Sequence, residues 1–138
     1  MNESASVLRF HNFSIDEMIY KRNNDFSQSD REIDLDFDFE ASAILSEEKE
    51  RAIITLTTEI FNEDFVDNEF PFYLKTTIRG FFTCSEDVNI KDFQFNGMAI
   101  LLPYVRSIIT SVTAQAGINP VILPPINVYK VFNKSEAK

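Results

Sequence analysis

Apolar and polar residues alternate without interruption from Glu32 to Ala43. The apolar positions are Ile33, Leu35, Phe37, Phe39, Ala41 and Ala43, and the polar positions are Glu32, Asp34, Asp36, Asp38, Glu40 and Ser42. Successive side chains of a strand point to opposite faces, so this pattern predicts a strand with one apolar face and one face of carboxylates. A helix would spread both sets around its surface.

Three further segments before about Thr83 share the two-residue period and are also predicted to be strands. They cover about residues 7–20, 51–61 and 70–82. In the first of them the apolar parity changes near His11, which predicts a β-bulge. Short polar links between the later strands favour an antiparallel meander, whereas the longer stretch 23–31 is expected to cross over between the first two strands.

In the last third of the chain the apolar residues recur at three- and four-residue steps, which predicts a long amphipathic helix. Asn96 is expected to cap its start, and Gly117 to end it in a left-handed conformation. Pro103 either kinks this helix or marks its first regular turn. An apolar, proline-rich stretch (INPVILPPIN) follows, and a short second helix is predicted for 126–132 before the polar tail 133–138.

Strands followed by helices predict a single α+β domain over residues 1–138, with strands at about 7–83 and helices at about 96–132. The expected architecture is a four-stranded antiparallel sheet with one long and one short C-terminal helix packed on one face. The other face of such a sheet is left open to solvent. We expect the carboxylates of 32–40 to project from it.

Composition and charge exclude several classes of protein. The formal net charge of −9 would repel phosphate, so nucleic acid is not an expected partner. Residues 1–69 hold 18 Asp/Glu and 6 Lys/Arg, and residues 70–138 hold 4 and 7, so the acidity is concentrated in the first half. We expect no secretory signal and no transmembrane helix. A single cysteine, Cys84, suits the reducing cytoplasm, and one cysteine with one histidine leaves no Cys/His zinc site.

No set of residues assembles into a convincing active site, so we expect a protein that is not an enzyme and needs no cofactor or metal. Gly80, Gly97 and Gly117 are too dispersed for a phosphate-binding loop, and no P-loop motif occurs. His11, the sole imidazole, falls in a predicted strand and is interpreted as a surface or interface side chain. Cys84 follows Phe81 and Phe82 closely and is interpreted as a small buried apolar residue.

Three features allow more than one interpretation. The carboxylate row is a solvated strand face, a docking surface for a basic partner, or a site for a divalent metal. The proline-rich stretch either packs under the long helix or forms the rim of an exposed apolar groove. The apolar stripe of the long helix is either ordinary core or a contact between subunits.

The C-terminal segment resembles the corresponding part of the protein-export chaperone SecB. The similar elements are the run Leu102-Pro103-Tyr104-Val105-Arg106, the helix end at Gly117, and the prolyl segment that closes with Pro125-Ile126-Asn127. Upstream, LDFD at 35–38 and GFF at 80–82 also match. The similarity covers about residues 7–132 and is most specific in the last third.

The resemblance implies a cytoplasmic, ATP-independent holdase that assembles as a dimer of dimers, with the long helices at the contact. It implies an apolar groove for unfolded polypeptides and an acidic outer face that docks the translocase ATPase SecA. The groove residues that we expect are Phe26, Ile33, Leu35, Phe37, Ile118, Val121, Ile122, Leu123 and Tyr129. The expected acidic docking residues are Glu17, Glu32, Asp34, Asp36, Asp38 and Glu40. The expected oligomer-contact residues are Leu101, Leu102, Val105, Ile108, Ile109 and Val112.

The sequence also departs from the family pattern. Glu17 keeps an acidic position that the family uses for SecA, whereas Lys21 and Lys75 replace two others, and Ser29 stands at a family tryptophan. These changes leave the holdase interpretation intact but weaken the export interpretation, so we weigh export and a dedicated client, such as an antitoxin, about equally. The alternative outside the chaperone class is an adaptor that binds one basic folded partner on its acidic sheet.

Overall fold

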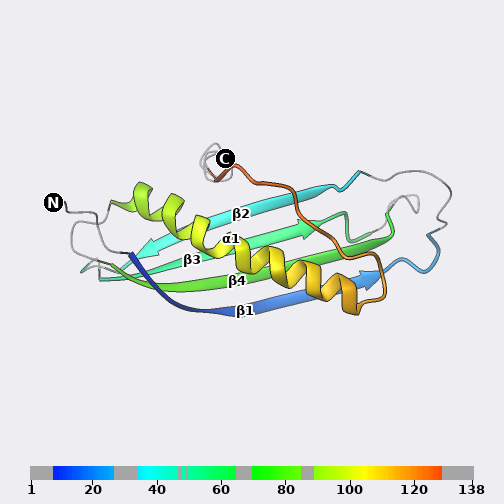
Figure 1. Cartoon of the computed structure of the whole chain (residues 1–138), viewed down its shortest axis with the longest axis horizontal. Helices are drawn as coiled ribbons and strands as arrows, with labels where there is room; N and C mark the ends of the chain where they lie inside the picture. Colours follow the sequence, from blue (N-terminus) through cyan, green and yellow to red (C-terminus); the bar gives the residue numbers. More distant parts are fainter. Residues whose placement is uncertain are drawn as a thin grey trace.

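The computed structural model describes residues 8–26, 34–46, 48, 50–64, 70–84 and 89–128. It contains a four-stranded antiparallel sheet and one long helix that crosses it diagonally (Figure 1). The elements are β1 (Leu8–Arg22), β2 (Phe37–Leu45), β3 (Arg51–Ile60), β4 (Phe72–Cys84) and α1 (Ile90–Gln115). The predicted α+β class and antiparallel sheet are therefore confirmed.

The strand order in the sheet is β1-β4-β3-β2. The strands β2, β3 and β4 form the predicted meander, while β1 lies on the far edge beside β4. The chain between β1 and β2 must consequently pass from one edge of the sheet to the other, as predicted for the stretch 23–31. This order leaves β1 and β2 as the two edge strands.

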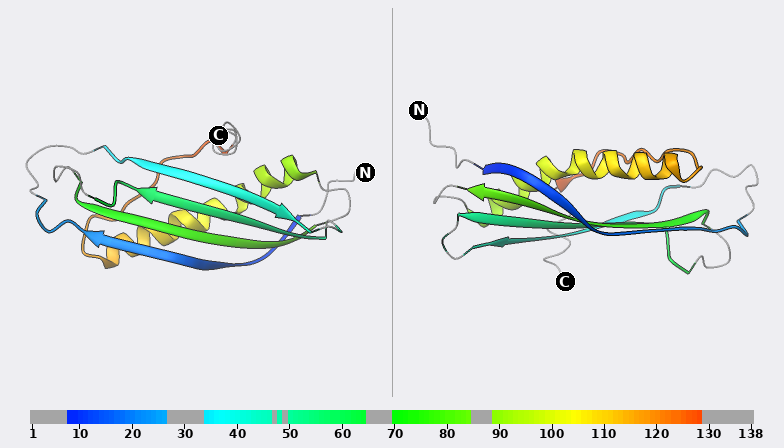
Figure 2. Two further views of the ribbon diagram at one scale, coloured as in Figure 1. Left: turned by 180° about the vertical axis from the view of Figure 1, so that it is seen from behind. Right: turned by 90° about the horizontal axis from the view of Figure 1, so that it is seen from below.

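The sheet has one covered face and one open face (Figure 2). On β3 and β4 every second side chain is buried beneath α1, including Ile54, Leu56, Leu74 and Ile78, each at most 1% exposed. The intervening side chains point away from α1, and we call that side the open face. The two-residue alternation in the sequence predicted this division correctly, because the faces of a strand have exactly that period.

The strand expected from Glu32 begins later, at Phe37. Residues 32–33 lie outside the described part, and residues 34–36 are not in a strand. The paired strand β3 ends at Ile60, opposite Phe37. The next residue, Phe61, has a φ of 63°, which turns the chain away from the sheet. The Phe61 N–H still donates to Asp36 O at 2.8 Å, so the two chains separate just beyond this bond.

The edge strand β1 carries two irregularities in its pairing with β4. One lies between Phe10 and Asn12, where the sequence predicted a bulge, and the second lies between Ile15 and Glu17. Each shifts the side chains of β1 by one position relative to β4. The second was not predicted, because the surrounding polar residues give no clear parity.

The helix α1 begins at Ile90, six residues before Asn96, the cap that the sequence predicted. Asn89 is the N-cap, and its side chain accepts a hydrogen bond from Lys91 N at 2.8 Å. Asn96, the predicted cap, is an exposed residue inside the helix. Pro103 also lies inside the helix, exposed, whereas Gly117 has the predicted left-handed conformation, with φ 84°, just after the helix end.

Two glycines let α1 approach the sheet closely. A Cβ at Gly80 would lie 2.6 Å from Cδ2 of Leu101, and a Cβ at Gly97 would collide with the Ile54 side chain. Gly80 lies on β4 and Gly97 on α1, so the missing side chains open space on both sides of the same interface. The core between the two layers depends on this short separation.

The predicted second helix is not shown. Ile126 and Asn127, its first two residues, are not helical, and residues 129–132 lie outside the described part of the chain. In length and composition α1 itself could cross a membrane, although no uninterrupted apolar run had suggested this. Core helices of soluble proteins meet the same criterion, and here eight residues of α1 are buried.

Candidate functional site

The segment 118–128, which we call the strap, leaves the end of α1 and runs back across the covered side of the sheet towards β2 (Figure 1). Four hydrogen bonds attach it to α1, and in one of them the Ile118 N–H donates to Thr113 O at 3.4 Å. Arg106 donates to Leu123 O at 2.9 Å, Thr110 donates to Val121 O at 2.7 Å, and the Val121 N–H donates to Thr113 Oγ1 at 2.8 Å. These bonds satisfy backbone groups that the three prolines of the strap region prevent from joining a regular element.

Adjacent residues of the strap have opposite environments. Leu123 is 1% exposed and belongs to the core, whereas Ile122 is 75% exposed. Leu123 is therefore not accessible in the single chain, since the Arg106 hydrogen bond holds its backbone where the side chain enters the core. Its place in a client-binding groove stays a prediction. Ile122 is the large aliphatic residue of the described strap that is most exposed to solvent.

Four other predicted groove residues pack against the core cluster that contains Leu123. Leu35, Phe37, Ile118 and Val121 are half-buried and pack against the same apolar cluster. Phe37 also contacts the Phe39 ring edge-on, at 5.6 Å between centroids. The structure thus brings the start of β2 and the strap, more than 80 residues apart in sequence, to one apolar region.

Three predicted groove residues remain, and one of them lies in the described part of the chain. Phe26 is half-buried in the turn after β1, where its N–H donates to Asn23 O at 3.2 Å. Ile33 and Tyr129 lie outside the described residues.

The apolar stripe of α1 is largely core rather than a free contact surface. Leu101, Leu102, Val105 and Ile109 are buried in the single chain, and the prediction that they form the contact between subunits stays a prediction. The sheet and the strap cover them together, because Leu123 belongs to the same core cluster as Leu102, Val105 and Ile109. Ile108 and Val112, the other two predicted contact residues, remain half-buried.

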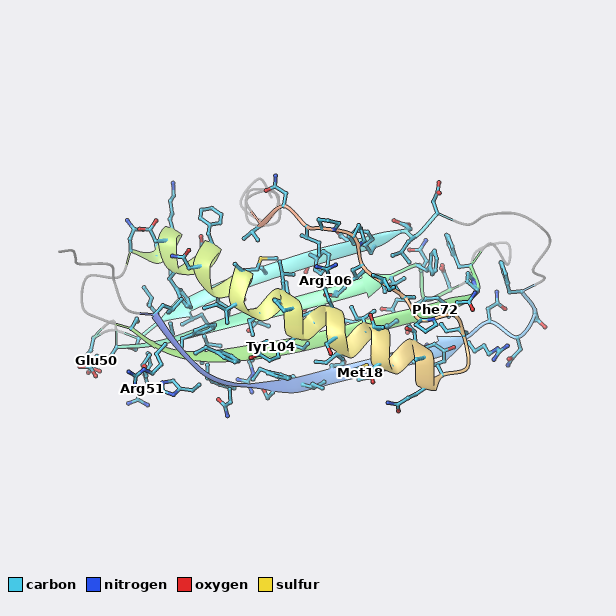
Figure 3. The ribbon with its side chains drawn as sticks, viewed as in Figure 1. Met18, Glu50, Arg51, Phe72, Tyr104 and Arg106 are labelled. Atoms are coloured by element: carbon cyan, nitrogen blue, oxygen red, sulfur yellow. The ribbon has the colours of Figure 1, made fainter. Side chains whose placement is uncertain are left out.

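A further apolar surface between α1 and β1 was missed by the sequence reasoning. Tyr104 is 41% exposed, and its ring lies 5.3 Å from the Phe10 ring and 5.1 Å from the Phe13 ring, measured between centroids. Ile15 and Met18 are exposed on the same side of β1 (Figure 3). The second bulge places them there, and only the L-P-Y motif pointed to Tyr104.

The open face has a neutral half on β1 and β4. Lys75 pairs with Glu17 at 3.2 Å, Lys21 pairs with Glu63 at 2.7 Å, and Arg79 pairs with Asp16. Lys21 and Lys75 thus neutralise carboxylates, and Glu17, predicted as a docking acid, is itself paired. Exposed ion pairs of this kind stabilise the fold little, so their main effect is on the surface potential.

These contacts shift the pKa values of Asp16, Glu63 and Lys75. A hydrogen bond from Ser14, with the Arg79 guanidinium adding to it, lowers the pKa of Asp16. The Lys21 ammonium lowers the pKa of Glu63, and Glu17 raises the pKa of Lys75. Each of these shifts favours the charged form, so Asp16, Glu63 and Lys75 stay charged at neutral pH.

The β2 and β3 half of the open face is acidic. Asp36, Asp38, Glu40 and Glu59, which we call the acidic end, are exposed, and Asp38 lies directly opposite Glu59. Tyr73 donates to Glu59 at 2.7 Å, and burial together with this carboxylate raises the pKa of its hydroxyl.

Three of these carboxylates line an open pocket of about 380 Å³. The pocket is formed by Asp36, Phe37, Asp38, Glu59, Phe61 and Asn62. Among the described residues, no group of three or more His, Cys, Asp or Glu is arranged to hold a metal ion. Asp34 is also exposed, while Glu32 lies outside the described part. The pocket suits a lysine or arginine side chain better than a bare cation.

Comparisons with known proteins agree with this geometry. Residues 11–138 match the family described as SecB, preprotein translocase subunit SecB. An uncharacterised protein of Methanocaldococcus jannaschii, MJ0357, is 34% identical over 125 residues, which cover 88% of this chain and 80% of that protein.

Two solved structures share the fold at low sequence identity. One is the Mycobacterium tuberculosis Rv1957 SecB-like chaperone in complex with a ChAD peptide from the Rv1956 HigA1 antitoxin. Its TM-score is 0.68 at 11% identity, over 87% of this chain and 91% of that chain. The other is a protein of unknown function from Streptococcus agalactiae, with a TM-score of 0.56 at 16% identity, over 88% and 100% of the two chains.

Proposed function

The chain belongs to the SecB family of chaperones, and from this premise we propose that it is an ATP-independent holdase that binds non-native polypeptides in the cytoplasm. The observation that carries the proposal is the strap, which runs from α1 to the β2 edge while Ile122 stays exposed. The proposed groove combines Ile122 with the half-buried Leu35, Phe37 and Val121.

Two physical terms support binding of an unfolded chain there. Burial of apolar surface contributes about 25 cal/mol per Å², so roughly 400 Å² buried between client and groove favours binding by about 10 kcal/mol before the entropic cost of association. The edge of β2 also offers backbone hydrogen-bonding groups to an extended client. Neither term depends on a particular client sequence.

We propose that the working unit is a dimer of dimers. The half-buried Ile108 and Val112 on α1, together with the exposed Tyr104, are the helix residues left to form the contact. If light scattering shows that the protein is a monomer at micromolar concentration, this assembly is contradicted.

The client is either a protein destined for export or a dedicated partner. The neutral half of the open face restricts any SecA docking to the acidic end, which favours a dedicated client such as an antitoxin. The Rv1957 complex with an antitoxin peptide is a precedent in a chain of the same fold. Titration of the assembled protein with SecA separates these roles.

The second candidate function is an adaptor that holds one folded basic partner, and the acidic pocket at Asp36, Asp38 and Glu59 favours it. Aggregation assays with several unrelated unfolded proteins distinguish the two functions. A holdase suppresses the aggregation of all of them, and Ile122→Asp reduces this suppression. An adaptor protects none of them, and Asp38→Lys abolishes its partner binding while Ile122→Asp leaves it unchanged.

A further inference from the structure

The open face carries an apolar row at the end opposite its acidic residues. The strand register places Ile44 opposite Ile53, and Ile53 opposite Phe81, so three large apolar side chains follow one another across β2, β3 and β4. Ile44 is 64% exposed, and the other two are half-buried. One exposed isoleucine is ordinary on a protein surface, whereas three neighbouring large apolar side chains on one face form an apolar patch.

Arginines surround this row. Arg51 and Arg9 both lie opposite Thr83, in the next row towards the end of the sheet. The Arg79 guanidinium stands 5.6 Å from the centre of the Phe81 ring on the other side. Arg79 is paired with Asp16, but no carboxylate in the described part of the chain forms an ion pair with Arg9 or Arg51. The three apolar residues and these arginines together form what we call the arginine patch.

The arginine patch is a basic, apolar surface on a protein whose net charge is −9. Ile44 lies six positions after Asp38 on β2, which corresponds to about 20 Å along the strand. On the face itself the two ends therefore have opposite character, while the exposed Glu48 and Glu50 lie in the hairpin beyond Arg51, outside the arginine patch. The acidic end would be pressed against the headgroups if the face lay flat on an anionic membrane, so the charge distribution favours a protein ligand over a lipid surface.

We propose that the arginine patch is a docking site for an acidic, apolar segment of a partner protein. Apolar side chains of the segment cover Ile44, Ile53 and Phe81, while its carboxylates pair with Arg51 and Arg9. The site lies on the open face, away from the strap on the covered face, so it does not depend on the proposed holdase function. Bound here, a partner leaves the groove available.

Two fluorescein-labelled synthetic decapeptides test the proposal by fluorescence anisotropy with the full-length protein. One alternates Asp or Glu with Phe or Ile, and the other has Lys at every acidic position. We expect the acidic peptide to bind at least about tenfold more tightly than the basic one at low salt. Arg51→Glu and Ile44→Ser should each weaken its binding by about tenfold, because each removes one charged or one apolar contact.

Matched controls separate this site from the groove. Ile122→Ser changes an even more exposed isoleucine, on the strap, and should leave acidic-peptide binding unchanged, while Arg51→Glu should leave aggregation suppression unchanged. Unaltered melting temperatures show that the variants fold. Three results would overturn the proposal: equal binding of both peptides, loss of binding in Ile122→Ser alone, or binding to phosphatidylserine vesicles that Arg51→Glu removes. Dissociation of the oligomer by Arg51→Glu would likewise assign the patch to a second copy of the chain.

Discussion

Neighbouring strap residues provide the sharpest test of how this structure works. Ile122 is 75% exposed and Leu123 is 1% exposed, so substitutions at the two positions should separate client binding from stability. We predict that Ile122→Asp abolishes most aggregation suppression with little change in folding. Leu123→Ala should chiefly destabilise the protein.

The magnitudes follow from burial. Truncating a buried leucine to alanine costs about 2–5 kcal/mol, a large part of the roughly 7–20 kcal/mol expected for a domain of this length. Surface substitutions usually change the free energy of unfolding by less than about 0.5 kcal/mol. Full burial of an isoleucine by a client contributes about 1.5–3 kcal/mol, so Ile122→Asp should weaken client binding by at least about tenfold.

Urea unfolding followed by circular dichroism measures the first quantity, and light scattering of an aggregating client measures the second. Hydrogen exchange of the Val121 amide reports on the strap, because that N–H is bonded to Thr113. It should be protected in Ile122→Asp and exchange faster in Leu123→Ala. The reasoning is refuted if Ile122→Asp keeps full holdase activity, or if Leu123→Ala is as stable as the unsubstituted protein.

Three further predictions concern the sheet, its open face and the strap. Gly97→Ala should destabilise the fold by about 1–3 kcal/mol, measured in urea, because its methyl group would collide with Ile54; an unchanged midpoint would contradict the close approach of α1. Ser14→Ala should raise the pKa of Asp16 towards its ordinary 3.8 in an NMR titration. Because the folded-state pKa lies below the ordinary value, the stability from this contact is present above pH 3.8 and is lost as the pH falls through the folded-state pKa; an unmoved titration would exclude the Ser14 hydrogen bond. Thr113→Val should lower the free energy of unfolding by about 1–3 kcal/mol, because it leaves the Val121 N–H without its acceptor. Hydrogen exchange of the Val121 amide as slow as in the unsubstituted protein would contradict this prediction.

The sequence was informative wherever one local period decided the outcome. Alternation over 51–61 predicted both β3 and its buried residues, and the change of parity near His11 predicted the first bulge of β1. The cap of α1 was misplaced because two asparagines precede apolar helical residues. Asn89 has Asp92 three positions later in the first turn, a sign of a helix start that Asn96 lacks.

The candidate site could be predicted only in part. The strap was recognised as apolar, but its composition does not distinguish Ile122 from Leu123, because both are large aliphatic residues in an extended segment. Their environments depend on hydrogen bonds to Arg106 and Thr110 on α1, which are long-range contacts. The same holds for the open face, where the sequence predicted a carboxylate row but not the partners of Glu17 and the two lysines.

The sequence by itself determined the elements of this protein, the apolar and polar side of each strand, and the acidity of β2, because these properties depend on residues two to four positions apart. The tertiary structure alone decided which apolar residues became core and which stayed accessible. It placed Leu101 and Leu123 in the interior, left Ile122 in solvent, and aligned Ile44, Ile53 and Phe81 across three strands. Strand order and the path of the strap bring together residues far apart along the chain, and no local period contains that information.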